Sequence, residues 1–354
     1  MSSNRSHALI FGASGISGWS LLNQCLQYPT PTAFRHAYLP DDPRLDLVSG
    51  INLTQPVSTV TEQLKINVHD IQNVNIVFFC AFIDHPNPDT RVSLNATILH
   101  TAIKSITTLS PLLSSVILQT GGMGSGLAFP NEVSITPPLQ ESTPRIAEPW
   151  ASKIFFYAQY DLLKELSNGP CQKWTFAEIR PDGIIGFVPI SNAMNLAHGI
   201  AFYLTLYRKK GYHSTHTDTS QDILAKMEIY AALNSDRYVS GEAYNIADGD
   251  VVSWSGVWPG LCEYFRLVGV EPSFIHGNKN AWDELVTESG LKQRIFEKQN
   301  WRFVEFMLVD FDFDREYDLS KAREVGFDER VDTVQGYWVA FDRMVRAGFI
   351  PSFE

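Results

Sequence analysis

Apolar residues recur along the first half of the chain with two periods, one typical of buried strands and one typical of helices. An apolar run covers 7–11 and ends at Gly12, and apolar residues return at helical spacing over 16–26. The same alternation predicts strands at 45–53, 75–82, 115–120 and 173–180, and helices at 59–71, 90–109 and 153–166. Strands that alternate with helices indicate an α/β fold with a doubly wound parallel sheet.

Three evenly spaced glycines, Gly12, Gly15 and Gly18, separate the first strand from the first helix, with Ser14 and Ile16 among them. In such a turn the early glycines let the backbone approach a pyrophosphate, and the last lets the helix pack on the strand. The helix N-terminus adds free N–H groups and partial positive charge. The turn predicts a dinucleotide-binding loop, with a purely structural turn as the alternative, and its spacing resembles that of short-chain dehydrogenase/reductases.

The choice of cofactor in such a fold depends on the end of the second strand, about 20 residues after the glycines. An acid at that point binds the ribose of NAD, whereas an arginine binds the phosphate of NADP. The only strand pattern there is short, at 33–38, and it contains Arg35 and no acid before Pro40 and Pro43 interrupt the chain. We expect NADP(H), with Arg35 as a solvated turn residue being the alternative.

The strands that end near Ala81 and Thr120 place these two residues at the carboxyl edge of the sheet, where doubly wound folds bind ligands. A glycine-rich stretch, 121–126, is expected to form a flexible loop over that edge. A proline-rich connector, 137–149, then leads to the helix at 153–166.

From about residue 187 onward the chain becomes aromatic-rich and mostly helical, and one strand, 241–247, is predicted to return to the sheet. We therefore expect an NAD(P)-binding Rossmann domain over 1–189 and a smaller, mostly helical substrate-binding cap over 190–354. The other segments of the cap are 192–209, 220–233, 252–268, 301–312 and 332–347. The aromatic residues that would form its core or line a pocket include Trp254, Trp258, Phe265 and Trp338.

The composition restricts the classes of partner. The chain has 354 residues and a net charge of −11 without a basic stripe, which argues against nucleic acids and anionic membranes. Polar residues lead directly into the first strand, and no apolar run approaches the roughly 18 residues of a membrane span. We expect a cytoplasmic protein that binds a small hydrophobic substrate, with a homodimer as an open alternative to a monomer.

The cysteines are too far apart to predict a disulfide framework or a zinc site, and we expect them to be small core residues. Their positions are Cys25, Cys80, Cys171 and Cys262. His213 and His216 form a short pair with no third ligand nearby, which favours a solvated loop over a metal site.

Reduction of a carbonyl needs a proton donor beside the atom that accepts the hydride, commonly a tyrosine whose pKa is lowered by a neighbouring cation. Tyr160 and Lys164 have the spacing of one helical turn that suits such a pair, and they follow the strand that ends at Thr120. The pattern alone is weak, because an amphipathic helix can contain it by chance.

A more specific pattern is Ile-Phe-Phe-Tyr-Ala-Gln-Tyr-Asp, which starts at Ile154, includes Tyr157 and ends at Asp161. It resembles the Asn-Phe-Tyr-Tyr-x-x-x-Asp stretch of the progesterone 5β-reductase/iridoid synthase-like (PRISE-like) short-chain reductases. Further segments resemble the fungal branch of that family and extend the likeness over nearly the whole chain. These segments are 12–18, 118–121, 179–187, 191–195, 245–249 and 311–315.

The resemblance implies an extended short-chain dehydrogenase/reductase that reduces enones or related carbonyls with NADPH. It implies that Tyr157, rather than Tyr160, is the catalytic acid, with Thr120 beside it, although either tyrosine could instead be a core residue. Besides the glycine turn and Arg35, the cofactor contacts that it implies are Asn52, Leu53, Ala81, Thr120, Tyr157, Pro181, Ile184 and Ser191.

Three departures from the family pattern bear on the redox reaction. Met123 stands where the family has the lysine that acts with the tyrosine, the second strand is short, and the segment 208–215 is shorter than the family's substrate loop. Lys153 and Lys164 are candidate replacements for that lysine.

The favoured function is an NADP(H)-dependent reductase of a hydrophobic enone or ketone in specialised metabolism, with Tyr157 as proton donor or oxyanion stabiliser. The alternative is a redox-silent isomerase or cyclase on the same scaffold, which Met123 and the short second strand suggest. A cofactor-sensing regulatory protein is a third hypothesis.

Overall fold

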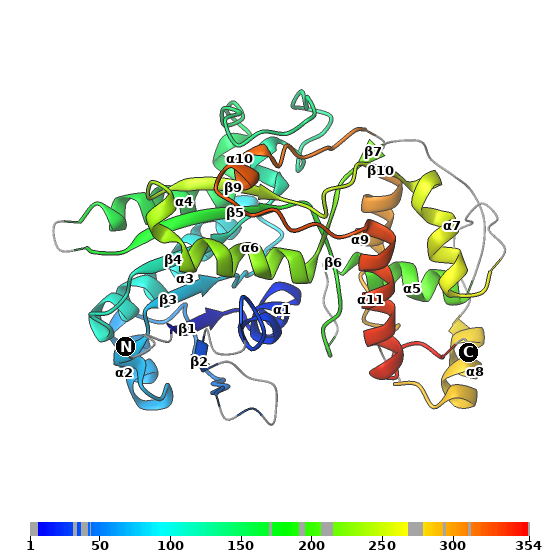
Figure 1. The fold of residues 1–354 in the computed structure, drawn as a ribbon, viewed down its shortest axis with the longest axis horizontal. Coiled ribbons are helices and arrows are strands. Elements are labelled where there is room, and N and C mark those ends of the chain that lie inside the picture. The colour runs from blue at the N-terminus through cyan, green and yellow to red at the C-terminus, as the bar shows by residue number, and fades with distance from the viewer. Residues whose placement is uncertain are drawn as a thin grey trace.

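The chain forms a body built on a central sheet, with a helical cap beside it (Figure 1). The structure is a computed structural model. It describes residues 6–30, 34–36, 42, 44–169, 172–190, 195–206, 215–267, 279–292, 295–310 and 313–352.

Parallel strands in the order β2-β1-β3-β4-β5-β9 form the six-stranded sheet of the body. Val77 in the central strand β3 pairs with Leu9 of β1 on one side and with Val116 of β4 on the other. All four residues of β3 are buried, as expected for a parallel sheet covered on both faces. The strands are β1 (Ser6–Phe11), β2 (Phe34–His36), β3 (Ile76–Phe79), β4 (Ser115–Gln119), β5 (Thr175–Pro181) and β9 (Glu242–Ile246). The predicted doubly wound parallel sheet is confirmed.

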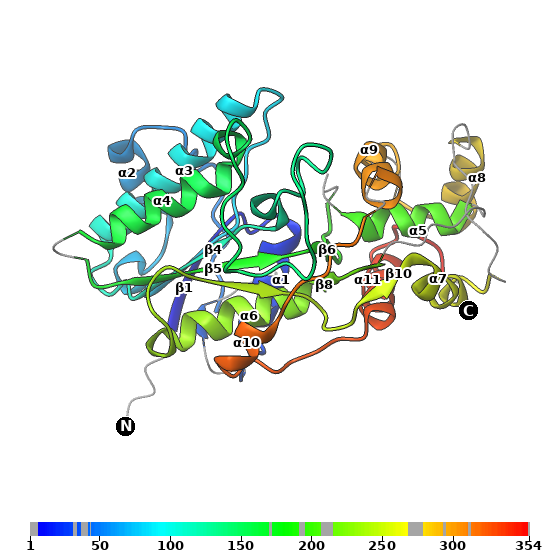
Figure 2. The same ribbon diagram turned by 90° about the horizontal axis from the view of Figure 1, so that it is seen from above.

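Helices cover both faces of this sheet, with α2, α3 and α4 on one face and α1 and α6 on the other (Figure 2). Each layer encloses its own apolar cluster, which contains Leu99 and Leu163 in the first layer and Leu21 and Ile229 in the second. The helices are α1 (Ile16–Cys25), α2 (Val57–Asn67), α3 (Pro88–Leu109), α4 (Phe155–Ser167) and α6 (Gln221–Leu233). The region 190–354 therefore contributes a helix, as well as the expected strand, to the body.

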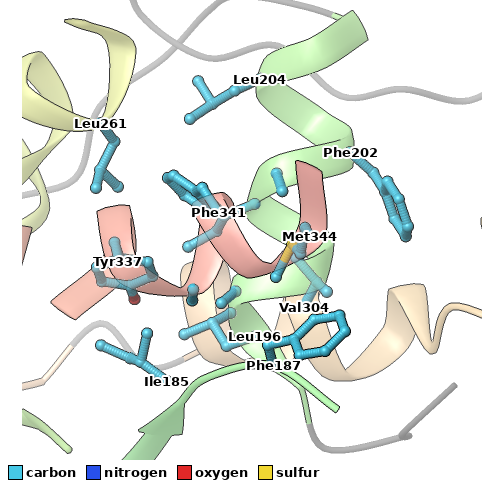
Figure 3. Close-up of a cluster of buried hydrophobic side chains, with 14 of the residues drawn as sticks. Ile185, Phe187, Leu196, Phe202, Leu204, Leu261, Val304, Tyr337, Phe341 and Met344 are labelled. Carbon is cyan, nitrogen blue, oxygen red and sulfur yellow. The ribbon is translucent and has the colours of Figure 1, made fainter. Parts of the chain in front are cut away.

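The cap is organised around α11, which contacts α5 and α7. Phe202, Tyr337 and Phe341 all belong to its buried apolar cluster (Figure 3), as do Trp254 and Phe265. Its helices are α5 (Leu196–Leu206), α7 (Trp254–Tyr264), α8 (Lys279–Ser289), α9 (Trp301–Glu305) and α11 (Thr333–Arg346), and α10 (Ser320–Glu324) contacts β9 of the body. Two small sheets pair β6 (Gly183–Ile185) with β8 (Asp218–Ser220) and β7 (Thr215–His216) with β10 (Val252–Ser253).

A group of buried charged residues links the end of β5 to the cap. Arg315 is 1% exposed, and its side chain places Nε 3.1 Å from Oδ1 of Asp182 and Nη2 3.4 Å from Oδ1 of Asp218. The Tyr337 hydroxyl, on α11, donates to Oδ2 of Asp218 at 3.1 Å. Each carboxylate thus has a charged or hydroxyl partner, as buried charges require.

Two sequence-based expectations are wrong in this part of the fold. Residues 45–53 form no strand; Leu45 and Leu53 instead pack into the two apolar layers from an irregular segment, while β2 takes the place beside β1 at the edge of the sheet. His216 is not solvated, because its ring lies 4.6 Å from that of Trp254 and Nε2 lies 3.4 Å from Asp218. His213 lies outside the described residues.

The structure also shows where the cysteines lie. Cys25 and Cys262 are buried free thiols and Cys80 is a half-buried one, whereas Cys171 lies outside the described residues.

The described residues contain no group of three or more His, Cys, Asp or Glu side chains that could hold a metal ion. Within the same ranges, no helix is both long and apolar enough to cross a bilayer.

Glu228 on α6 is an isolated buried acid. It is 1% exposed, and neither carboxylate oxygen has a hydrogen-bond partner within the described part of the chain. Burial raises the pKa of Glu228 to about 8. Since an unfolded chain would ionise this group from its ordinary pKa of 4.5 upward, its contribution to stability falls as the pH rises from that value toward 8.

We expect Glu228→Met to stabilise the fold by about 1 to 3 kcal/mol at pH 8, because the buried carboxyl is then absent. At pH 5 the gain is expected to be smaller, since the folded protein holds the neutral acid there. Urea unfolding at both pH values measures the difference. An equal gain at the two pH values would contradict ionisation as its cause.

Candidate active site

The turn between β1 and α1 is shaped by its glycines. Gly12 has a φ of +93°, and a Cβ at that position would lie 2.8 Å from the backbone nitrogen of Ala81 at the end of β3. A Cβ on Gly18 would overlap the carbonyl oxygen of Gly12, so α1 packs this closely on the turn only because Gly18 lacks a side chain. The N–H of Gly15 closes the turn by donating to the Gly12 carbonyl at 3.0 Å.

The N-terminus of α1 has the properties of an anion site. Gly15 is its N-cap and offers no side chain to the first N–H groups, and the first turn from Ile16 onward has no acidic residue. Ser14, just before it, is exposed. A helix end of this kind attracts phosphate through its N–H groups and its dipole, so the turn can hold the pyrophosphate of a dinucleotide.

Several predicted site residues meet at one edge of the sheet. Ala81 follows β3, Thr120 follows β4, and Pro181 ends β5, so all three lie at the carboxyl ends of neighbouring strands. Ile184 lies just beyond them, in β6. Together with the glycine turn after β1, they outline the place where a cofactor can lie across the edge.

The other predicted cofactor contacts are less well placed. Asn52 is exposed, and its side-chain oxygen accepts hydrogen bonds from the N–H and the hydroxyl of Thr54 at 3.0 and 2.8 Å. Leu53 is half-buried against the apolar layer that contains α2. Arg35 lies in β2, but its side chain is outside the described part of the structure, as is all of Ser191.

Thr120 belongs to a buried polar chain beneath the edge. Its hydroxyl donates to Oε1 of Glu178 on β5 at 2.7 Å, and Oε2 of Glu178 accepts from Arg180 at the same distance. Because the hydroxyl proton is committed to Glu178, the oxygen of Thr120 can act toward a further partner only as an acceptor. Glu178 was not predicted from the sequence, where its one signal is an acid within the otherwise apolar stretch before Arg180.

Tyr157, near the start of α4, reaches the loop that follows β4. Its hydroxyl donates to the carbonyl of Gly124 at 2.5 Å and accepts from the backbone N–H of Ile146 at 3.1 Å. Gly124 belongs to a short 3₁₀ helix, η2 (Gly122–Ser125), in the stretch that was expected to be a flexible loop. Burial raises the pKa of Tyr157 above its ordinary value.

Tyr160 and Lys164 lie further along α4, away from this edge. The Tyr160 hydroxyl donates at 2.8 Å to the carbonyl of Gly241, which immediately precedes β9 and so lies at the amino ends of the strands. Lys164 is exposed in the last turn of α4. The structure therefore brings Tyr157, rather than the Tyr160 and Lys164 pair, to the edge that carries Thr120.

The lysines considered as replacements for the family lysine are not placed beside the Tyr157 hydroxyl. Lys153, just before α4, forms an ion pair with Asp89 of α3, with Nζ 2.6 Å from Oδ1. Met123, which matches the family lysine, lies in η2 and carries no charge. The cation nearest the ring of Tyr157 among the described contacts is instead Arg145, whose guanidinium carbon is 4.5 Å from the ring centroid.

Comparison with known proteins shows which families and enzymes this chain resembles. The sequence profile of a family described as "PRISE-like Rossmann-fold domain" matches residues 8–351. The short chain dehydrogenase ausT of Aspergillus calidoustus is 32% identical, over 97% of this chain and 94% of its own length. A 3-oxo-Delta(4,5)-steroid 5-beta-reductase of Arabidopsis thaliana is 26% identical, over 90% and 87%. The solved GDP-mannoheptose C4 reductase of Campylobacter jejuni, with NADP bound, shares the fold at a TM-score of 0.62 and 14% identity, over 97% and 99% of the two chains.

Proposed function

The chain belongs to the PRISE-like Rossmann-fold family and is an enzyme of the short-chain dehydrogenase/reductase type, and from this premise we propose that it reduces a hydrophobic enone or ketone with NADP(H). The observation that carries the proposal is the position of Tyr157. Its hydroxyl lies beside the loop after β4, at the same edge as the glycine turn. A proton donor and a dinucleotide loop on one edge are the two parts that carbonyl or enone reduction requires.

The cofactor fits the residues on this edge. A nicotinamide cofactor supplies the hydride when it is bound. Gly12 and Gly18 let the turn pack against the end of β3 and the start of α1, where a Cβ would overlap the backbone, and this close packing leaves the N-terminus of α1 available to the pyrophosphate. Arg35 on β2 is the residue that would select the additional phosphate of NADP(H).

Tyr157 supplies the acid of the proposed reaction. Its hydroxyl proton now points to the Gly124 carbonyl, and a turn of that hydroxyl toward the edge would present the proton to a substrate oxygen. The N–H of Ile146 donates to the same oxygen and so stabilises the charge that develops there when the proton leaves. Thr120 keeps an acceptor oxygen at the edge, which orients a donor group of the cofactor or substrate.

The proposed substrate class follows from the relatives. The Arabidopsis relative is named for a 3-oxo-Δ4,5-steroid, in which the carbonyl and the double bond form an enone. The fungal relatives lead us to place the reaction in specialised metabolism. Cytoplasmic location and homodimer formation remain predictions from the sequence.

Titration of the purified protein with NADPH and NADH, followed by tryptophan fluorescence, tests the cofactor. We expect micromolar binding of NADPH and weaker binding of NADH. Ser14→Asp tests the location of the site, because Ser14 is exposed and a carboxylate there repels the pyrophosphate. We expect this variant to bind NADPH about 10-fold more weakly with an unchanged melting temperature. If the protein binds neither nucleotide, the proposed reductase activity is overturned.

A redox-silent isomerase or cyclase is the second candidate, and the uncharged Met123 in η2 favours it. The two candidates differ in one observable. A panel of enones and ketones with NADPH shows a loss of absorbance at the nicotinamide band only if hydride is transferred. Conversion of a substrate without loss of NADPH would support the isomerase or cyclase.

A further inference from the structure

We propose that Arg145 is the residue that stabilises the ionised form of Tyr157, that Asp161 positions it, and that the two act with the N–H of Ile146 as one phenolate-binding unit. This inference rests on the proposed function in one respect only, the role of Tyr157 as the acid. It assigns a role to a residue outside the glycine turn and outside the edge of the sheet.

The guanidinium of Arg145 lies over the face of the Tyr157 ring. Its central carbon is 4.5 Å from the centroid of that ring and 5.7 Å from the centroid of the Tyr160 ring. A cation over the face of a phenol is attracted by the ring, and the attraction grows when the phenol loses its proton and becomes negative. Arg145 is therefore placed to favour the phenolate over the phenol.

Asp161 holds the guanidinium in this position. Its two oxygens accept from Nη1 and Nη2 of Arg145 at 2.7 and 2.6 Å, a bidentate geometry that fixes the plane of the guanidinium. Tyr157 and Asp161 are four residues apart on α4, so their side chains share one face of the helix. The acid that the sequence pattern places after Tyr157 thus acts through Arg145.

Ile146, the residue after Arg145, provides the second contact. Its backbone N–H donates to the Tyr157 hydroxyl oxygen. Two consecutive residues of the connector therefore contact Tyr157, Arg145 at the ring face and Ile146 at the oxygen. The connector is anchored elsewhere, because the side chain of Asn245 donates to the Leu139 carbonyl at 2.8 Å and its backbone N–H donates to Glu141 at 2.7 Å. These contacts hold the unit in place before any ligand arrives.

The other charges that face Tyr157 come from β5. Glu178 and Arg180 neutralise each other through their ion pair of 2.7 Å. Burial is the main influence on the pKa of Tyr157 and raises it, whereas the Ile146 N–H, Arg145 and Arg180 lower it and Glu178 raises it. Burial also raises the pKa of Tyr160 on the same helix. Arg145 is itself paired with Asp161, and its distinguishing feature is that its guanidinium lies over the face of the Tyr157 ring.

The test is a titration of one tyrosine. A fluorinated tyrosine installed at position 157 has a lower intrinsic pKa, so it titrates while the protein is folded, and its ¹⁹F signal reports only that residue. We expect Arg145→Met to raise this pKa by roughly 0.5 to 1 unit. For Asp161→Asn we also expect a rise, because Arg145 loses the bidentate pair that holds it over the ring. A fall would show instead that Arg145 stays in place with its charge no longer compensated, and would contradict the positioning role of Asp161.

Lys153→Met is the matched control, since it removes a cation beside the same helix that pairs with Asp89 and not with the tyrosine. It is expected to leave the pKa unchanged. If Arg145→Met does not fold, Arg145→Lys serves instead, and its loss of the bidentate pair is expected to raise the pKa as well. A pKa that is unchanged in the folded arginine variant and in Asp161→Asn would overturn the proposal.

The titration needs neither cofactor nor turnover, so its outcome is separate from that of the reductase assignment. If the protein binds no NADPH but shows the expected shift in the Tyr157 pKa, the phenolate-binding unit is supported and the reductase assignment is overturned. If the protein reduces a substrate with NADPH but shows no shift, the reductase assignment is supported and the role of Arg145 is overturned.

Discussion

Tyr157→Phe is expected to lower kcat for reduction of the enone or ketone by about 10² to 10⁴-fold, because the variant keeps the ring and loses the proton that the proposed acid would donate to the substrate. NADPH binding should change by no more than about twofold, because the pyrophosphate is proposed to bind at the glycine turn after β1, and β3 and β4 separate β1 from β5, which α4 contacts. Steady-state kinetics and the fluorescence titration measure the two effects.

Tyr160→Phe is the matched control for this prediction. Tyr160 is on the same helix and Arg145 also lies near its ring, but its hydroxyl donates to the Gly241 carbonyl at the amino ends of the strands. We expect kcat within about threefold of the parent and a loss of about 1 kcal/mol in unfolding free energy, which is the usual contribution of one hydrogen bond. Equal loss of kcat in the two variants would contradict Tyr157 as the acid.

Arg315→Met is expected to lower the unfolding free energy by about 3 to 5 kcal/mol, which is typical when one partner of a buried ion pair is removed. Arg315 is 1% exposed and contacts Asp182 and Asp218. Removing the cation leaves two carboxylates close together, whose mutual repulsion adds to the cost of their burial. Urea unfolding at pH 7, with the slope checked against the parent, measures the loss.

Two further variants identify the cause. Arg302→Met removes an exposed arginine that pairs with Glu305 three residues later, and we expect a change of no more than about 0.5 kcal/mol. Asp182→Asn combined with Arg315→Met removes one of the two uncompensated charges, so part of the stability should return. A loss below about 1 kcal/mol in Arg315→Met would show that solvent or other groups compensate the two aspartates.

The strand, turn and helix that begin the body are predictable from the sequence because their determinants lie within a few residues of one another. Gly12 adopts a left-handed φ and Gly18 approaches the turn itself, so the glycine spacing alone indicates the geometry. The alternation of strands and helices likewise predicts the parallel sheet. The strand expected at 45–53 was wrong because apolar residues such as Leu45 can be buried from an irregular segment when no neighbouring strand offers pairing.

Which tyrosine reaches the edge is decided by contacts between distant segments. Tyr157 and Tyr160 are close in sequence and share a helix face, but one donates to Gly124, 33 residues away, and the other to Gly241, 81 residues away. The burial of His216 likewise depends on Trp254, which is distant in the sequence and comes close only in the folded chain.

Local spacing thus determines the parallel sheet and the dinucleotide turn of this protein, because their backbone sterics act between near neighbours. The choice of Tyr157, its approach to Arg145 and the buried pairing of Arg315 arise only when the sheet, the connector and the cap pack together, because hydrogen bonds and charges act between whichever groups the fold makes adjacent.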